Sequence, residues 1–220
     1  MPYHINADHI RLEELQRRIE ASDLVPSRSS LLNELNKKMN QIKKQGISTL
    51  TELRIAIKTP KRIDSLAQDT GIDKDFFVLL RREIESYFPK PFSLTSFDWL
   101  PQDEIKELAK EGIENTAQFY VYFQEKNKKE DFKASSQMNE EVYNQLMCLC
   151  DLTRIQWTSP LAARMLFDAG YHSVRMVALS DPEILFNALT KINKRDQYFK
   201  GNIGLRDIKR LINSASYLTK

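Results

Sequence analysis

A short pattern centred on a glycine occurs three times and constrains the fold more than any other feature. The copies read KKQGISTLTEL (43–53), AKEGIENTAQF (109–119) and FDAGYHSVRMV (167–177). In each, an apolar residue stands four positions before the glycine, and a residue type that favours helix N-caps stands three positions after it. Glycine ends helices because it adopts the left-handed backbone conformation cheaply. The pattern therefore predicts helix–turn–helix hairpins that turn at Gly46, Gly112 and Gly170.

Residues after the turns strengthen the prediction of helix. Thr49 is followed three residues later by Glu52, and Asn115 by Gln118, which is the spacing of a capping box. Gly71 leads into a further helix, and apolar residues recur at steps of three and four through most of the chain. Convincing strand-like alternation is missing from the sequence. We therefore predict an all-α fold.

The recurrence of the pattern also predicts the domain boundaries. We expect a leader with one amphipathic helix and three helical units, over residues 1–27, 28–90, 91–153 and 154–220. Prolines in YFPKPFSLTSF (87–97) interrupt helix at one junction, and RIQWTSP (154–160) marks the next. Trp99 and Trp157 stand ahead of the second and third units, and we expect both to pack between units.

Composition excludes several classes of protein. A hydrophobic content of 41% and a charged content of 29% are typical of globular proteins. No apolar run approaches the ~20 residues of a membrane span, and the first residues lack the order of a signal peptide, so we expect a cytoplasmic protein without membrane contact. Cys148 and Cys150 fit neither a redox nor a zinc motif. With no phosphate loop or catalytic motif, we predict neither an enzyme nor a metal or small-molecule cofactor.

The hairpins resemble helix-hairpin-helix domains, which are small SAM-like helical units. KEGIENTAQF is similar to the turn of the C-terminal domain of the bacterial RNA polymerase alpha subunit. The whole chain, including LVPSRSSLL (24–32) and FFVLLRREIESYFPKP (76–91), resembles an uncharacterised bacterial domain-of-unknown-function family built from tandem helix-hairpin-helix-like units. The resemblance implies binding of duplex DNA without sequence preference, through hairpin amides and nearby Lys and Arg that meet phosphates.

Charge is distributed in a way that bears on this expectation. Basic residues outnumber acidic ones over 28–66 and 191–220, whereas acidic residues prevail over 67–130. If phosphate is bound, the expected contacts are Lys43, Lys44, Gly46, Arg81, Arg82, Lys200, Gly204, Arg206, Lys209 and Arg210.

The turns depart from the DNA-binding pattern. Each repeated turn has a single glycine, where the DNA-binding hairpin has Gly-x-Gly, and Glu114 would repel a phosphate at the second turn. Only GNIG (201–204) keeps two glycines near a helix start. We therefore predict a non-catalytic module for protein interaction or scaffolding, whose protein partner is unknown. Sequence-independent DNA binding through the basic hairpins of the first and third units is the alternative.

Overall fold

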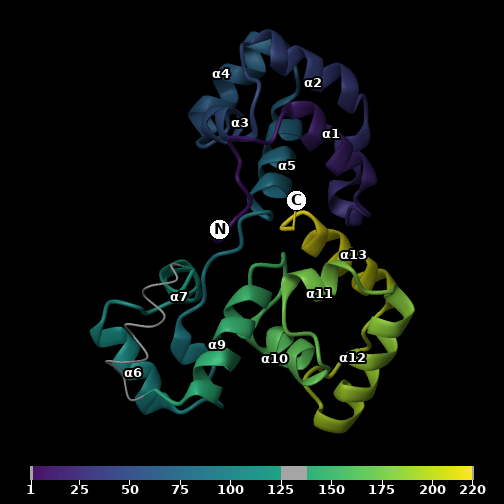
Figure 1. Ribbon diagram of the computed structural model, residues 1–220. Coiled ribbons are helices and arrows are strands. Elements are labelled where there is room, and N and C mark those ends of the chain that lie inside the picture. The colour runs from purple at the N-terminus through teal and green to yellow at the C-terminus, as the bar shows by residue number, and fades with distance from the viewer. Residues whose placement is uncertain (1, 125–137, 220) are drawn as a thin grey trace. The chain divides into compact units, whose positions relative to one another are not determined.

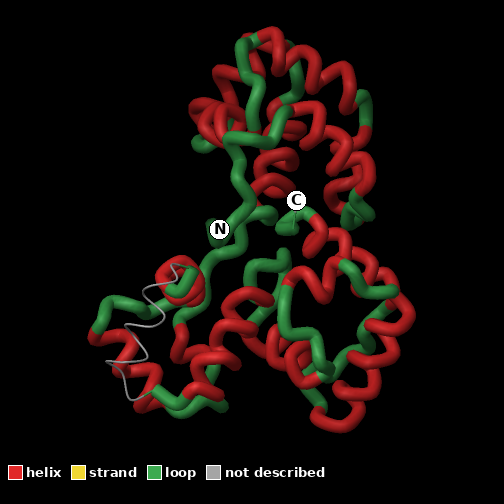
Figure 2. Tube along the Cα trace, viewed as in Figure 1, coloured by secondary structure: helices red, strands yellow, loops and turns green. Residues whose placement is uncertain are grey.

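The computed structural model describes residues 2–124 and 138–219 (Figure 1). Within these residues the regular structure is helical, and extended pairing is limited to two isolated bridges (Figure 2). The predicted all-α fold is therefore confirmed for the described part of the chain. No helix in that part is both long enough and apolar enough to cross a membrane.

The chain forms two compact units, each with its own hydrophobic core. Residues 5–88 form the small unit, and residues 1–4 together with 89–220 form the large unit. The small unit is thus an insertion between two segments of the large one. The leader and the first repeat share the small unit, and the second and third repeats share the large unit. The division into three helix-hairpin-helix-like units stays a prediction.

Five α-helices and a short 3-10 helix build the small unit. They are α1 (Leu12–Ala21), η1 (Pro26–Leu32), α2 (Leu35–Lys44), α3 (Leu50–Ala56), α4 (Pro60–Thr70) and α5 (Lys74–Glu85). Their apolar faces meet in one core, which includes the fully buried side chains of Leu15, Met39, Leu53 and Phe77. Gly71, at φ +67°, ends α4 in the left-handed conformation.

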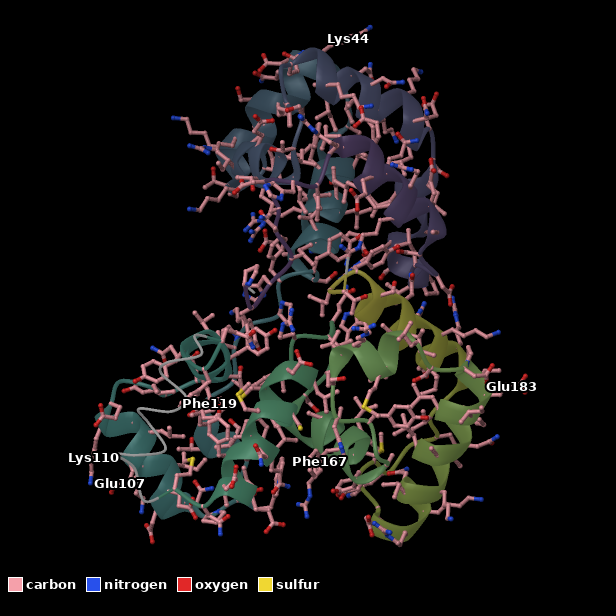
Figure 3. All side chains as sticks on the ribbon, in the orientation of Figure 1. Lys44, Glu107, Lys110, Phe119, Phe167 and Glu183 are labelled. Atoms are coloured by element: carbon pink, nitrogen blue, oxygen red, sulfur yellow. The ribbon has the colours of Figure 1, made fainter. Side chains whose placement is uncertain are left out.

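The large unit consists of a short 3-10 helix and seven described α-helices. They are η2 (Leu94–Ser96), α6 (Gln102–Lys110), α7 (Thr116–Tyr122), α9 (Glu140–Leu152), α10 (Pro160–Asp168), α11 (Val174–Ala178), α12 (Pro182–Asp196) and α13 (Leu205–Ser216). Phe97, Phe119 and Leu146 are among the fully buried residues of its core. Phe119 packs between α7 and α9 (Figure 3).

A polar network with a buried arginine lies inside the large unit. Arg154, 5% exposed, donates from Nε to the Tyr3 carbonyl at 2.9 Å and from Nη1 to the Tyr120 hydroxyl at 2.7 Å. The same Nη1 donates to the Asp151 carboxylate. The Tyr3 hydroxyl lies 2.8 Å from Thr116 Oγ1. A residue at the start of the chain is thus held by residues more than one hundred positions away.

The small unit also contains a buried carboxylate. Glu83, 3% exposed, accepts from Arg28 Nη1 at 2.7 Å and from the Tyr87 hydroxyl at 3.0 Å. The guanidinium of Arg18 lies 3.8 Å from the centre of the Tyr87 ring. Buried charges are tolerated where partners of opposite charge and hydrogen bonds compensate the loss of water.

The two tryptophans differ in their surroundings, which corrects one expectation. Trp99 packs against the core of the large unit, and the Arg164 guanidinium lies 4.7 Å from its ring centre. Trp157 is 59% exposed and has a φ of +66°, so it does not pack between units as predicted. A bulky residue rarely adopts positive φ, and this one turns the chain between α9 and α10.

Candidate functional site

The three hairpins that recur in the sequence are α2–α3, α6–α7 and α10–α11. Their turning glycines, Gly46, Gly112 and Gly170, have φ values of +81°, +77° and +88°. Beyond Gly112 and Gly170, the amides of Ile113 and Tyr171 donate back into the preceding helix, at 3.0 and 2.9 Å. These bonds use carbonyls that a helix end leaves without partners, and they set the angle at which the second helix starts.

In the first hairpin, a carboxylate occupies the amides that would have to meet a phosphate. Glu52 Oε2 accepts from the backbone amide of Ser48 at 2.7 Å and from that of Thr49 at 2.9 Å. It also accepts from the Ser48 hydroxyl at 2.9 Å. Thr49 Oγ1 accepts from the Glu52 amide at 3.2 Å and completes the predicted capping box. The Glu52 carboxylate thus takes the position at this turn that a bound phosphate would need.

The second hairpin repeats this arrangement with a neutral side chain. Gln118 Oε1 accepts from the amides of Glu114 at 2.9 Å and Asn115 at 3.2 Å. Asn115 Oδ1 accepts from Ala117 and Gln118, which completes the second predicted capping box. The amides facing the turn are again occupied from within the chain.

The third hairpin differs because the residue three positions after its N-cap, Met176, has no side-chain oxygen to accept from the turn amides. Ser173 Oγ accepts from the Met176 amide at 3.2 Å, but the Met176 side chain carries no oxygen. The amide of Val174 donates instead to Asp151 Oδ2, at 2.8 Å. In the first two hairpins the corresponding amides, of Leu50 and Thr116, donate to backbone carbonyls that lie ahead of the hairpin, those of Ile10 and Phe92.

The contrast between the first two hairpins predicts a local pH dependence. The backbone amide of Ser48, and to a smaller extent that of Thr49, stabilises the charged form of Glu52 and lowers its pKa from 4.5 to about 2. Because folding lowers this pKa, the ionised Glu52 stabilises the folded protein. The stabilisation is fully present above the ordinary pKa and is lost as the pH falls toward 2. We expect a carboxyl NMR titration to give Glu52 a midpoint near 2.

Gln118 provides the matched comparison for that titration. We expect Glu52→Gln to be less stable than the wild type above about pH 4.5. This difference should disappear as the pH falls toward about 2, because the wild-type carboxyl protonates there. Conversely, Gln118→Glu should acquire a carboxyl with a lowered pKa. A Glu52 midpoint near its ordinary value would mean that the turn amides do not hold the carboxylate.

An apolar residue is exposed at the same position of each repeat, at the end of the second hairpin helix or directly after it. Nine residues after the glycines stand Ile55, Val121 and Leu179, which are 53%, 47% and 76% exposed. Seven residues after the glycines, the side chains are instead fully buried: Leu53, Phe119 and Val177. The sequence reasoning did not include the exposed position, although counting nine residues from each glycine would have found it.

The predicted phosphate contacts belong to two separate compact units. Five lie in the small unit and five in the large unit: Lys43, Lys44, Gly46, Arg81 and Arg82, and Lys200, Gly204, Arg206, Lys209 and Arg210. Several are already engaged: Lys43 forms an ion pair with Glu13 at 2.6 Å, and the Gly204 amide donates to Asp207 at 3.2 Å. Lys44, by contrast, is exposed and projects to solvent from the end of α2 (Figure 3).

The groups that could support redox or metal chemistry are few. Cys148 is half-buried and Cys150 is buried, and burial raises the pKa of both thiols, most strongly that of Cys150. A raised pKa disfavours the thiolate, which is the reactive form. Among the described residues, no group of three or more His, Cys, Asp or Glu side chains is placed to hold a metal ion.

Comparison with known proteins places part of the chain in a family. A family profile described as Domain of unknown function (DUF4332) matches residues 100–218, which is more than half of the chain. The match covers the second and third hairpins. No curated protein and no solved structure matches the chain.

Proposed function

Because the chain belongs to the DUF4332 family, whose description names no activity, we propose a function from the hairpins themselves. The chain is a non-catalytic module that binds other proteins or scaffolds their assembly. The observation that carries this proposal is the exposed apolar residue at one position of all three hairpins, Ile55, Val121 and Leu179.

Repetition gives these residues their weight. Single exposed apolar side chains are common on protein surfaces and need no explanation. Here the residue two positions earlier is buried in the core each time, so the helix has a distinct outer face. On that face all three copies expose an apolar side chain where a polar one would keep the surface hydrated. Burial of such side chains is a main source of affinity between proteins.

The third hairpin adds further apolar surface around Leu179. Met176, one turn earlier on α11, is 46% exposed, and Ile184 in the first turn of α12 is 66% exposed. These three residues lie within nine positions of one another around the α11–α12 corner. This corner is the strongest single contact point that we propose in the large unit.

Site-specific photo-crosslinking in cells tests the proposal. The photoreactive amino acid p-benzoylphenylalanine is placed, one position at a time, at Ile55, Val121 or Leu179. Matched controls carry it at Lys44 and Lys110, which end the first helix of two hairpins and project to solvent (Figure 3). We expect discrete protein adducts from the hairpin positions and none from the controls. Equal adducts from both sets, or none from the hairpin positions, would contradict the proposal.

DNA binding through the basic residues is the second candidate function. It is favoured by Lys44, Lys200 and Lys209, which are exposed and form no ion pair with any described residue. Against it stand the hairpin amides, which Glu52 and Gln118 already occupy.

A salt series separates the two functions. Fluorescence anisotropy with duplex DNA should show no tight, steeply salt-dependent binding if the module binds proteins. Micromolar affinity that falls steeply with salt, and that Lys43→Glu with Lys44→Glu weakens, would instead establish phosphate contacts and favour the DNA function.

A further inference from the structure

The corner between α3 and α4 combines an exposed apolar side chain with uncompensated positive charge. Residues 54–62 read RIAIKTPKR and contain four basic residues and no acidic one. Ile55 is the exposed apolar residue of this hairpin. We propose that this basic corner, formed by Ile55, Lys58, Lys61 and Arg62, binds an acidic amphipathic segment of a partner protein. The inference rests on the proposed function and specifies the partner of the first hairpin.

Two arginines of this segment are held in place by contacts within the small unit. Arg54 donates to both oxygens of Glu85, at 3.0 and 3.1 Å, and its guanidinium lies 3.6 Å from the ring centre of Phe88. Arg62 Nη1 donates to the Ile55 carbonyl at 2.7 Å. The hydrogen bond from Arg62 holds its guanidinium beside the backbone of Ile55. A carbonyl is uncharged, so this bond leaves the positive charge of Arg62 uncompensated.

The remaining positive charges of the corner have no acidic partner within residues 2–124 and 138–219. Lys58 and Lys61 are exposed, and neither forms an ion pair with any residue that the structure describes. Lys58 follows Ile55 by three residues, and Lys61 stands in the first turn of α4. With Arg62, three cations thus follow the exposed side chain of Ile55 within seven residues of sequence. Arg54, which precedes the corner, adds no net charge because Glu85 neutralises it.

The position of Lys61 and Arg62 is unfavourable for the isolated protein. Both lie at the start of α4, where Thr59 caps the helix and Pro60 takes its first position. The start of a helix carries partial positive charge, so cations there are repelled and anions are stabilised. The first turn of α4 contains no acidic residue that would compensate. Carboxylates of a partner would supply the missing negative charge.

Chemistry favours a peptide over a phosphate backbone as the occupant. The exposed surface of Ile55 gains from an apolar partner, which a chain of phosphates does not offer. The turn amides of the same hairpin, at Ser48 and Thr49, are already taken by Glu52. An acidic amphipathic helix offers apolar residues at steps of three and four with carboxylates beside them. It can therefore cover Ile55 and meet the cations together.

Titration of the full chain against a defined peptide tests the inference. The probe is a fluorescein-labelled peptide of about 16 residues, with Leu at helix spacing and Glu elsewhere. We expect saturable binding that Lys58→Glu with Lys61→Glu weakens at least about tenfold. Ile55→Ser should weaken it about tenfold as well, since it removes the apolar contact. These side chains are exposed, so the variants should keep the circular dichroism and thermal midpoint of the wild type.

Lys44→Glu is the matched control, because it reverses one exposed charge of the same unit outside the corner. We expect it to change the affinity by less than about twofold in buffer of physiological ionic strength. The inference is overturned if the peptide does not bind saturably, or if Lys44→Glu weakens binding as much as the corner variants. It is also overturned if Ile55→Ser has no effect, since the corner would then be a general site for anions such as DNA or acidic vesicles. If one of these outcomes is observed while Val121 and Leu179 still give cross-links to other proteins, the inference fails but the proposed function is retained.

Discussion

Replacement of Arg154 by alanine is expected to lower the free energy of unfolding of the large unit by about 3–5 kcal/mol, the usual cost of removing one partner of a buried ion pair. The change leaves the Asp151 carboxylate, whose side chain is 19% exposed, without its cation. It also removes the donor to the Tyr3 carbonyl and the Tyr120 hydroxyl. Arg154→Lys should recover part of the loss, because lysine restores the charge but cannot bond several partners in one plane.

Urea unfolding followed by tryptophan fluorescence provides the measurement. Both tryptophans of the chain, Trp99 and Trp157, belong to the large unit, so their emission reports on that unit. Arg175→Ala is the matched control, since Arg175 is an exposed arginine of the same unit, and its removal should cost less than about 0.5 kcal/mol. A similar, small effect of Arg154→Ala would mean that water compensates Asp151 and that the network contributes little.

Replacement of Glu83 by alanine is expected to destabilise the small unit by about 3 kcal/mol. The Arg28 guanidinium and the Tyr87 hydroxyl would both lose the carboxylate to which they donate. The expected cost lies at the lower end of the range for buried pairs, because the Arg28 side chain is 23% exposed and can turn partly to water. An isosteric apolar pair, Arg28→Met with Glu83→Leu, should recover most of the stability.

The two compact units allow a sharp readout for this variant. Far-ultraviolet circular dichroism reports on the helices of both units, whereas tryptophan fluorescence reports on the large one. We expect Glu83→Ala to shift the circular dichroism transition and to leave the fluorescence transition in place. Glu85→Ala is the control: it breaks the exposed pair with Arg54 on the same unit and should cost at most about 1 kcal/mol. Equal shifts of both signals would show that the units unfold as one.

The hairpins were the part of the fold most open to prediction from sequence. Gly46 and Gly112 stop their helices through backbone conformation alone, and the capping residues Thr49 and Asn115 act on amides two or three positions away. Such local rules can be read along the chain. The occupation of the turn by Glu52 follows from the same local spacing.

Features that depend on distant residues could not be predicted in this way. The contact of Tyr3 with Thr116 and Arg154 joins segments with no shared pattern, and only the packed structure brings them together. The exposure of Trp157 likewise depends on how α9 and α10 meet. The pattern of phosphate-binding hairpins does not indicate the basic corner, because that pattern concerns only the turn itself. The basic residues of the corner follow the second hairpin helix instead, and Ile55 lies near the end of that helix.

The folded large unit and the segment that matches the family do not have the same bounds. The family match begins at residue 100, whereas the folded large unit is completed by Tyr3. Excision of the matched segment would leave Thr116 and Arg154 facing the space that Tyr3 fills. We therefore expect the family segment, when expressed without Tyr3, to be less stable than the same segment in the full chain.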